Sequence, residues 1–257
     1  MKKILNLVLL CLMLFCSGCG KKQPADTLEA VIERGVIRAG VRIDAEPFGF
    51  INKTGKNDGF DVDIARHIAY KILGSPDKIE FVPVSAAGRI ETLTSDRADI
   101  MAAAMSKTPE REKIIDFSNP YYTAGQTAVV RKRSRIYSFA DLKDRTVIIV
   151  SGSTAKKNLR RIMPSVRIVE YENYNKAFQA FKDGGGDALC ADDAIISGFT
   201  ARNEDFRIFN SRISSEHYSI GVKKTEDKAL IKKLNTIIDE MQMDGLIREL
   251  KKKHGLP

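Results

Sequence analysis

The alternation of short apolar segments with segments of helical periodicity most constrains the fold of this chain. Strands are predicted where β-branched and apolar residues cluster in short runs. These runs lie at residues 36–41, 79–84, 99–104, 126–130, 146–150, 166–169, 187–191 and 217–222. Helices are predicted between them at residues 61–72, 89–93, 154–162 and 174–181, and a long final helix is interrupted at Gly245. Because helical connections leave consecutive strands parallel, the pattern predicts an α/β protein with largely parallel sheets.

The N-terminal segment predicts export from the cytoplasm. A short basic start is followed by an apolar run at residues 4–15 and then by small residues. These features are typical of a secretory signal peptide, and the run is too short to span a bilayer stably. We therefore expect residues 1–18 to be removed and the polar residues 19–27 to form a short tether.

The cysteines add a prediction about the membrane. Ser17-Gly18-Cys19 resembles the cleavage motif of bacterial lipoproteins, in which the cysteine becomes the lipidated first residue, although Cys16 stands where leucine is usual. Lipidation of Cys19 would anchor the protein to the cell membrane, since each buried methylene contributes about 0.8 kcal/mol. A cleaved leader without lipid is the alternative. The apolar surroundings of Cys190 predict a buried strand residue, and no internal disulfide is expected.

The composition argues against several functions. The net charge of +9 is compatible with nucleic acid binding, but no basic helix with interleaved aromatic residues occurs and tryptophan is absent. The glycines at residues 184–186 lack the Lys-Ser/Thr pair of a nucleotide-binding loop. The histidines are far apart, and no Gly-x-Ser-x-Gly motif occurs. We therefore expect no nucleic acid partner, no metal and no cofactor.

A series of motifs, all in the right order, resembles one protein family. Gly59-Phe60-Asp61-Val62-Asp63-Ile64 resembles the signature of the bacterial extracellular solute-binding proteins of family 3, which serve ATP-driven importers of polar amino acids. The other motifs are Pro47-Phe48, residues 99–106, Thr108-Pro109-Glu110-Arg111, residues 116–121, Ser151-Gly152-Ser153-Thr154, residues 187–193 and Asp244-Gly245. The resemblance covers nearly the whole mature chain and is closest to the glutamate/aspartate-binding branch.

The resemblance implies a type II periplasmic-binding-protein-like fold of two α/β lobes, each a mixed sheet flanked by helices. The first lobe would comprise residues 28–124 and 219–257, and the second lobe residues 125–218. Two hinge strands, near residues 125–130 and 217–222, would join them. The ligand would lie in the cleft and be trapped by hinge closure. The implied partners are an amino acid and the permease and ATPase subunits of an ABC importer.

The expected first-lobe residues include partners for both ends of a zwitterion. A dry cleft must provide a cation for the carboxylate and an anion for the ammonium group of an amino acid. Arg111 resembles the family's carboxylate-binding arginine, and a guanidinium matches two carboxylate oxygens. The resemblance assigns Ser106 to the same carboxylate and the Ala104 carbonyl to the ammonium group. A surface arginine is the alternative for Arg111 taken alone.

The expected second-lobe residues lie where two helices begin. Ser153 and Thr154 open a helix whose free N–H groups favour an anion, although simple capping is compatible with the same residues. Asp192 follows a predicted strand and matches the family's ammonium-binding aspartate. Asp193 competes with it, since either carboxylate can cap the following helix. We expect Asp192 to contact the ligand.

The specificity residues depart from the commonest family pattern. Ala45 and Ala86 stand where many relatives place aromatic rings, and Arg42 and Arg89 resemble arginines of the glutamate/aspartate branch. Additional arginines suggest a second carboxylate on the ligand, because a buried guanidinium without an anion is costly. The alternative is that Arg42 pairs with Asp44 and that Arg89 braces the cleft. Glutamate or aspartate is therefore the expected ligand, with glutamine or cystine as alternatives.

Two other functions remain as alternatives on the same fold. The first is an enzyme resembling cyclohexadienyl or arogenate dehydratase, which would need a histidine or glutamate with a tuned pKa in the cleft. All three histidines map outside the expected cleft, and Glu46 is the nearby carboxylate. The second is a sensing module of a receptor. We expect a binding protein and no enzyme.

Overall fold

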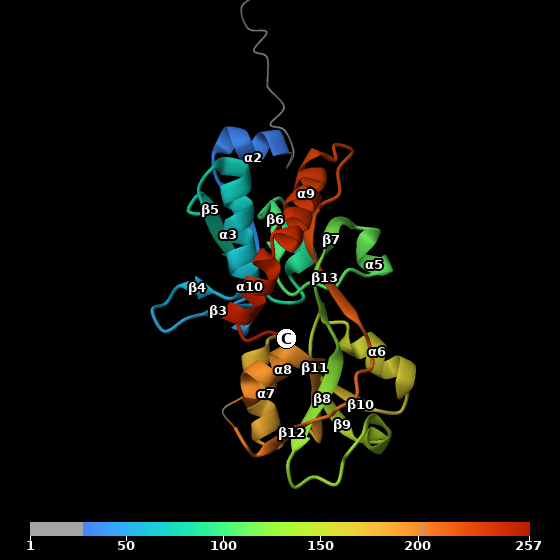
Figure 1. Cartoon of the computed structure of the whole chain (residues 1–257). Coiled ribbons are helices and arrows are strands. Elements are labelled where there is room, and N and C mark those ends of the chain that lie inside the picture. Colours follow the sequence, from blue (N-terminus) through green and yellow to red (C-terminus); the bar gives the residue numbers. More distant parts are fainter. Residues whose placement is uncertain (1–27, 202) are drawn as a thin grey trace, which may run out of the picture.

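The structure, a computed structural model, describes residues 28–201 and 203–257, which form two lobes (Figure 1). Each lobe contains one five-stranded sheet with helices packed around it. This confirms the predicted α/β fold class. The predicted signal peptide, the lipidation site Cys19 and the tether at 19–27 lie outside the described residues.

The first sheet has the strand order β5-β1-β6-β13-β7. Its strands are β1 (Ile37–Val41), β5 (Ile79–Pro83), β6 (Ile100–Ala102), β7 (Ile115–Ala124) and β13 (Glu216–Lys223). β1 pairs in parallel with β5 and β6, whereas β13 pairs antiparallel with β6 and β7. The helices of this lobe are α2 (Leu28–Arg34), α3 (Phe60–Leu73), α4 (Arg89–Thr94), α5 (Pro109–Glu112), α9 (Ala229–Met243) and α10 (Leu246–Lys253). A separate small sheet contains β2 (Asp44–Ala45), β3 (Gly49–Ile51) and β4 (Asn57–Asp58).

The second sheet repeats this mixture with the order β10-β9-β11-β8-β12. Its strands are β8 (Gln126–Arg131), β9 (Thr146–Val150), β10 (Arg167–Tyr171), β11 (Ala188–Asp192) and β12 (Phe206–Ile208). β9 pairs in parallel with β10 and β11, and β8 pairs antiparallel with β11 and β12. Its helices are α6 (Ala155–Ile162), α7 (Tyr174–Lys182) and α8 (Asp193–Thr200), with a short 3-10 turn, η1, at Phe139–Leu142.

The chain crosses between the lobes over shorter segments than the sequence predicted. The expected hinge strand at 125–130 coincides with β8, which belongs to the second sheet, so the first crossing is at Gly125. The expected hinge strand at 217–222 coincides with β13, whose pairing with β7 extends to Glu216 opposite Ala124. Residues 216–218, expected in the second lobe, therefore pair within the first sheet. An apolar strand pattern reveals no pairing partner, so the sequence could not place these crossings.

Local sequence determines where several helices begin and end. The Thr108 side chain accepts a hydrogen bond from the backbone N–H of Arg111, and Pro109 occupies the first turn of α5, where its fixed φ suits a helix start. Gly74 ends α3 in the left-handed conformation that glycine adopts without strain. Gly245, with φ of 79°, separates α9 from α10 and confirms the predicted interruption.

An aromatic cluster packs within the first lobe. Phe48 lies edge-to-face against Tyr122 and Tyr218, with ring centroids 5.1 Å apart in each pair. Phe60 packs against the same group at 6.2 Å from Phe48. Edge-to-face packing fixes ring orientation as well as burying apolar area. The cluster therefore holds the Tyr218 hydroxyl, which belongs to a crossing strand, in a fixed direction.

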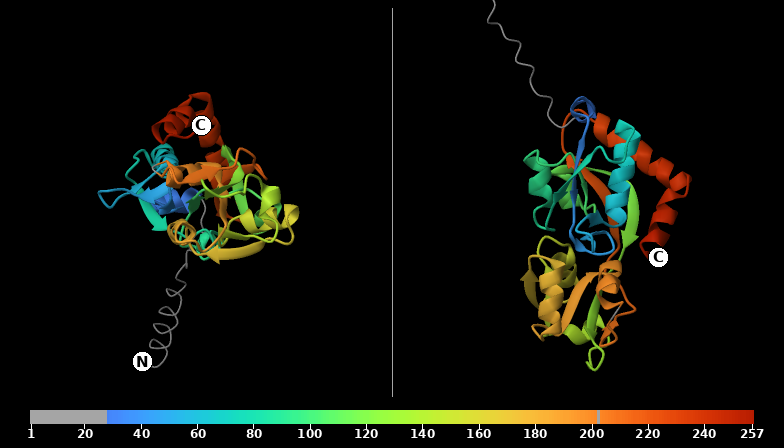
Figure 2. Two further views of the ribbon diagram at one scale, coloured as in Figure 1. Left: turned by 90° about the horizontal axis from the view of Figure 1, so that it is seen from below. Right: turned by 90° about the vertical axis from the view of Figure 1, so that its left-hand side faces the viewer.

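The C-terminal helices lie along the outside of the first lobe. In Figure 2 (right), α9 and α10 run down this lobe, and the chain ends level with the junction of the two lobes. Within residues 28–201 and 203–257, no helix combines the length and apolarity needed to span a membrane. Cys190 is buried in β11, as predicted, and burial raises the pKa of its thiol.

Candidate functional site

A small pocket between the lobes contains all eight residues predicted to bind the ligand. The first lobe contributes Arg42, Ala86, Arg89, Ala104, Ser106 and Arg111, and the second lobe contributes Ser153, Thr154, Tyr174, Asp192 and Ile195. Tyr174 and Ile195 were not predicted from the sequence. Both stand in the first turn of a second-lobe helix, and only the packing of the lobes shows that α7 and α8 begin at the cleft.

Arg111 projects from α5 into this pocket. Its Nη1 donates to the Ser106 carbonyl at 2.7 Å, and its Nη2 donates to the Gly152 carbonyl at 2.9 Å. Ser106 belongs to the first lobe and Gly152 to the second, so the guanidinium already connects the two lobes. Burial lowers the pKa of Arg111, while carboxylates including Glu216 and Asp192 favour its charged form. These two hydrogen bonds hold the positively charged guanidinium of Arg111 in place at the pocket.

Asp192 and Asp193 have different partners, although both stand where β11 ends and α8 begins. Asp192 accepts a hydrogen bond from the Tyr218 hydroxyl through Oδ2. Its Oδ1 is buried without a hydrogen-bond partner, and burial raises the pKa of this carboxylate, which the nearby Gln126 side chain lowers. Asp193 accepts from the backbone N–H of Ala194 at 2.8 Å and forms an ion pair with Arg212. Burial, followed by the charge of Glu216, raises the pKa of Asp192 to about 6. The unsatisfied acceptor in the pocket is therefore on Asp192.

Arg42 is neutralised within its own lobe. Its Nε and Nη2 donate to the two carboxylate oxygens of Asp44, each at 2.7 Å, and the Arg42 side chain is only 2% exposed. Asp44 Oδ2 also accepts from the backbone N–H of Tyr174 in the second lobe, at 2.8 Å. Asp44 therefore already balances the charge of Arg42, so a second ligand carboxylate would lack a counterion at this side chain. The structure thus contains the predicted alternative, in which Arg42 pairs with Asp44.

Arg89 braces the cleft through backbone carbonyl groups. It donates to Ala86 O at 2.9 Å, Ala103 O at 3.0 Å, Ala104 O at 2.8 Å and Gly152 O at 3.0 Å. A guanidinium has five N–H groups, so four of them are already used. Burial, followed by the charges of Arg111 and Arg42, lowers the pKa of Arg89 to about 9, which leaves it charged at neutral pH.

The Ala104 carbonyl, predicted to accept from the ligand ammonium group, accepts from Arg89 instead. Ala104 adopts a φ of 46°, which is uncommon for a residue with a side chain. Its N–H donates to Asp61 at 2.6 Å, and the Tyr121 hydroxyl donates to the other oxygen of the same carboxylate at 2.8 Å. The sequence indicated only that Asp61 begins a helix. The structure shows that this carboxylate also fixes the backbone at the pocket.

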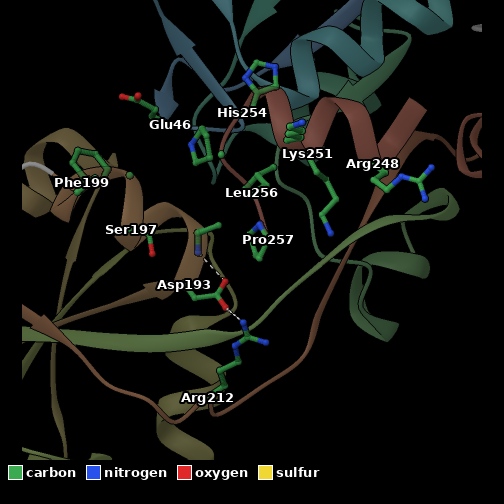
Figure 3. Close-up of a pocket in the computed structure, with 16 residues that line it drawn as sticks. Glu46, Asp193, Ser197, Phe199, Arg212, Arg248, Lys251, His254, Leu256 and Pro257 are labelled. Carbon is green, nitrogen blue, oxygen red and sulfur yellow. Dashed lines mark hydrogen bonds and ion pairs between the residues drawn. The ribbon is translucent and has the colours of Figure 1, made fainter. Parts of the chain in front are cut away.

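A second hollow lies beside the crossing strands and is distinct from this pocket. Figure 3 shows Leu256 and Pro257 of the C-terminal segment facing α8, with the ion pair of Asp193 and Arg212 at the edge. Glu46, the carboxylate considered for the enzyme alternative, is exposed and lines this hollow rather than the pocket. Neither Arg111 nor Asp192 lines it, so it is not the site that the sequence predicts for an amino acid.

The residues considered for the enzyme alternative, Glu46 and the three histidines, lie outside the pocket. The His217 ring is hydrogen-bonded to Thr123, and the His254 ring to Asp63. Neither histidine lines the pocket, nor does His67. Across the part of the chain that the structure describes, no group of three or more histidine, cysteine, aspartate or glutamate residues could hold a metal ion.

The fold and the pocket define a class of protein: a two-lobed binding protein that holds a small ligand between its lobes. Residues 37–257 match the bacterial extracellular solute-binding proteins, family 3, and the chain belongs to that family. This confirms the family predicted from the motifs, whose members serve amino acid uptake by ABC importers. It also confirms a location outside the cytoplasm, whereas lipidation of Cys19 stays a prediction.

Three similar proteins illustrate the relationship. The ABC transporter glutamine-binding protein of Bacillus subtilis (strain 168) is 38% identical over 98% of this chain and 97% of that protein. The glutamine-binding protein of Geobacillus stearothermophilus is 42% identical over 77% of each. The crystal structure of the solute receptor for L-cysteine of Neisseria gonorrhoeae superposes with a TM-score of 0.85 at 36% identity, over 89% of this chain and 93% of that one. The first two are named as binding proteins and the third as a solute receptor.

Proposed function

We propose that this protein binds an α-amino acid with an uncharged polar side chain and delivers it to an ABC importer. Glutamine is the first candidate ligand. The observation that supports this most directly is the buried Oδ1 of Asp192, which lacks a partner in a pocket also lined by Arg111. An ammonium group would satisfy this oxygen, and a carboxylate would pair with the guanidinium. The two ends of a zwitterion thus have one partner in each lobe.

The charge balance of the pocket favours a neutral ligand. Among the described residues, and leaving Asp61 aside, three arginines and three carboxylates lie in the pocket or bond directly to residues that line it: Arg42, Arg89, Arg111, Asp44, Asp192 and Glu216. Asp61 adds a fourth carboxylate behind Ala104, and burial raises its pKa to about 6. A zwitterion leaves this balance unchanged, whereas an acidic amino acid would add a buried negative charge without a counterion.

The expectation of glutamate or aspartate rested on two arginines being free. Arg42 pairs with Asp44, and Arg89 has four carbonyl partners, so neither presents an uncommitted cation. The two relatives named for glutamine are consistent with the revised proposal. Glutamate remains the most informative competitor, because it differs from glutamine only in the group at the end of its side chain.

The experiment is a thermal-shift screen of the mature protein against each common amino acid, followed by calorimetric titration of those that stabilise it. A ligand present at a hundred times its Kd should stabilise the folded protein by about 2.7 kcal/mol. We expect glutamine to give the largest shift and glutamate a smaller one. A larger shift with glutamate would restore the acidic-ligand hypothesis.

The Arg111→Ala variant tests the carboxylate end of the site. We expect it to abolish the shift for every amino acid, because it removes the cation proposed to pair with the α-carboxylate. The matched control is Arg97→Ala, since the Arg97 side chain is 55% exposed and pairs with Glu91 away from the pocket. Binding that survives in Arg111→Ala would refute this arrangement of the zwitterion.

We also infer attachment to the membrane through Cys19. The lipoprotein-like motif supports this proposal. In cells labelled with a radioactive fatty acid, we expect the mature protein to be labelled and to sediment with membranes. Cys19→Ser should lose both properties, and an unlabelled wild-type protein would favour the cleaved leader without lipid.

A further inference from the structure

Four polar side chains beside the second-lobe side of the pocket form a closed ring of hydrogen bonds. Asn158 Nδ2 donates to Glu216 Oε1 at 2.9 Å and to Gln126 Oε1 at 2.8 Å. Gln126 Nε2 donates to Thr154 Oγ1 at 2.6 Å, and Thr154 Oγ1 donates to Glu216 Oε2 at 2.9 Å. Glu216 and Gln126 are buried, whereas Thr154 lines the pocket. The ring connects the first residue of β13, a strand of the first sheet, to the start of α6 at the pocket.

Glu216 sets the direction of every hydrogen bond in this ring. Its carboxylate accepts from Asn158, from Thr154 and, at 2.7 Å, from the Ser214 hydroxyl. Because a carboxylate can only accept, Asn158 must turn its amide nitrogen toward Glu216, and Thr154 must use its single hydroxyl hydrogen there. Gln126 then has its oxygen toward Asn158 and its nitrogen toward Thr154. One carboxylate thus orients three neighbouring polar groups.

The consequence for the pocket is that the Thr154 hydroxyl can only accept a hydrogen bond from a ligand. A hydroxyl has one hydrogen and two lone pairs. The hydrogen is used by Glu216 and one lone pair by Gln126, so one lone pair remains. Asp192 Oδ1, in the same pocket, is also an acceptor without a partner. The predicted contact of Thr154 with an anion would therefore have to use backbone N–H groups.

We propose that Glu216 is a specificity-determining positioning residue, which acts through Thr154 so that this wall of the pocket accepts N–H groups and rejects carboxylate oxygens. The inference rests on the proposed function and extends it. Glutamine and glutamate differ only in an amide that can donate and a carboxylate that cannot. A fixed acceptor distinguishes the two, because a polar contact that the wrong ligand cannot make leaves buried groups unpaired.

A double-mutant cycle tests whether Glu216 acts through Thr154. The Kd values of glutamine and glutamate are measured by calorimetry for wild type, Glu216→Gln, Thr154→Val and the double variant. An amide at position 216 can donate to Thr154 Oγ1, which frees the hydroxyl hydrogen for the ligand. We expect Glu216→Gln to shift the ratio of the two Kd values toward glutamate by about tenfold, the scale of one hydrogen bond to a charged group. In the Thr154→Val background, the same change should shift the ratio by clearly less, because only the loss of the Glu216 charge then acts.

Ser214→Ala is the matched control. It removes a hydrogen bond from the same carboxylate but leaves Thr154 untouched, so the Kd ratio should stay at the wild-type value. Melting temperatures of all variants identify any loss of folding. Equal weakening of both ligands in Glu216→Gln would reduce Glu216 to a structural role and overturn the proposal. A shift of the ratio that is equally large without the Thr154 hydroxyl would also overturn it.

A second measurement separates this proposal from the identity of the ligand. If wild type does not bind glutamine, the proposed function fails, but the crystal structure of the complex with whichever amino acid the screen identifies still tests the ring. We expect a ligand nitrogen within hydrogen-bond distance of Thr154 Oγ1. A ligand carboxylate oxygen at that position would overturn the assignment of Thr154 as an acceptor.

Discussion

At the scale of single residues, Asp192 has a geometry that costs stability. Its carboxylate is buried and one oxygen has no partner, so folding disfavours the ionised form and raises the pKa. A folded-state pKa above the unfolded value means that stability present at low pH is lost as the pH rises through the folded pKa. Such a cost persists at sites where a ligand supplies the missing partner.

We therefore expect Asp192→Asn to stabilise the protein without ligand. The pKa of Asp192 rises from 3.8 to about 6, which corresponds to a gain on the order of 1–3 kcal/mol at pH 7 when the charge is removed. The gain should vanish near pH 4, where Asp192 is already protonated in the folded state. Urea unfolding at both pH values measures this, and amino acid binding should be lost. A less stable variant at pH 7 would contradict it.

Ligand affinity should depend on pH for the same reason. The ionised form of Asp192 is the partner of an ammonium group, so affinity should be constant above about pH 7 and fall as the pH drops through about 6. The decrease should approach about tenfold per pH unit at lower pH. Asp61 also has a pKa of about 6, and Asp61→Asn is the control that should keep the profile. A flat profile in wild type would exclude Asp192 as the partner.

At the scale of elements, the turn between β9 and α6 brings the lobes together. Gly152 adopts a φ of 78°, and a Cβ atom built there would lie 2.4 Å from the Cα of Ala87 in the first lobe. Its carbonyl accepts from both Arg89 and Arg111. Only a glycine allows both this conformation and this approach. The start of α6, which contains Thr154, reaches the cleft for that reason.

Gly152→Ala should weaken binding by separating the lobes. We expect the Kd to rise by about tenfold or more, because at least one buried hydrogen bond to a charged guanidinium is lost. The control is Gly184→Ala, which has a φ of 89° but no atom closer to its Cβ than 3.7 Å. It shares the cost of the left-handed conformation without the contact and should bind normally. Equal effects of both changes would assign the loss to backbone strain.

At the scale of the whole molecule, the closed arrangement is held by buried contacts between the lobes. The Tyr174 N–H donates to Asp44, and Arg89 connects carbonyl groups of both lobes. The exposed ion pair of Lys157 and Glu110 also crosses the cleft. Solvent screens exposed pairs, so the buried contacts dominate closure.

Arg89→Ala tests whether buried contacts contribute more to closure than exposed ion pairs, and it tests the role of Arg89. It leaves buried carbonyl groups without donors, so we expect the affinities for glutamine and glutamate to fall by the same factor, about tenfold or more. Lys157→Ala should change either Kd by no more than about twofold. Calorimetry measures both, and small-angle scattering reports closure. A selective loss of glutamate binding in Arg89→Ala would instead make Arg89 the partner of a second carboxylate.

Short-range patterns determined much of this protein from the sequence alone. The apolar periodicities predicted the strands and helices, and Thr108 and Gly245 marked a helix start and a helix break because capping and left-handed turns depend on adjacent residues. These local features depend on the residues themselves and on their neighbours in the chain. The two lobes and the eight residues that meet in the pocket were implied instead by the family resemblance of the ordered motifs.

The tertiary structure alone decided which charges in the pocket are free. Tyr174 is 130 residues from Asp44, Glu216 is 62 residues from Thr154, and Gly152 is 63 residues from Arg89. Whether an arginine is neutralised, or which way a hydroxyl points, depends on these distant partners and on burial. A sequence pattern contains neither quantity, because both arise only when the two lobes pack together. The revised expectation of a neutral ligand follows from that packing.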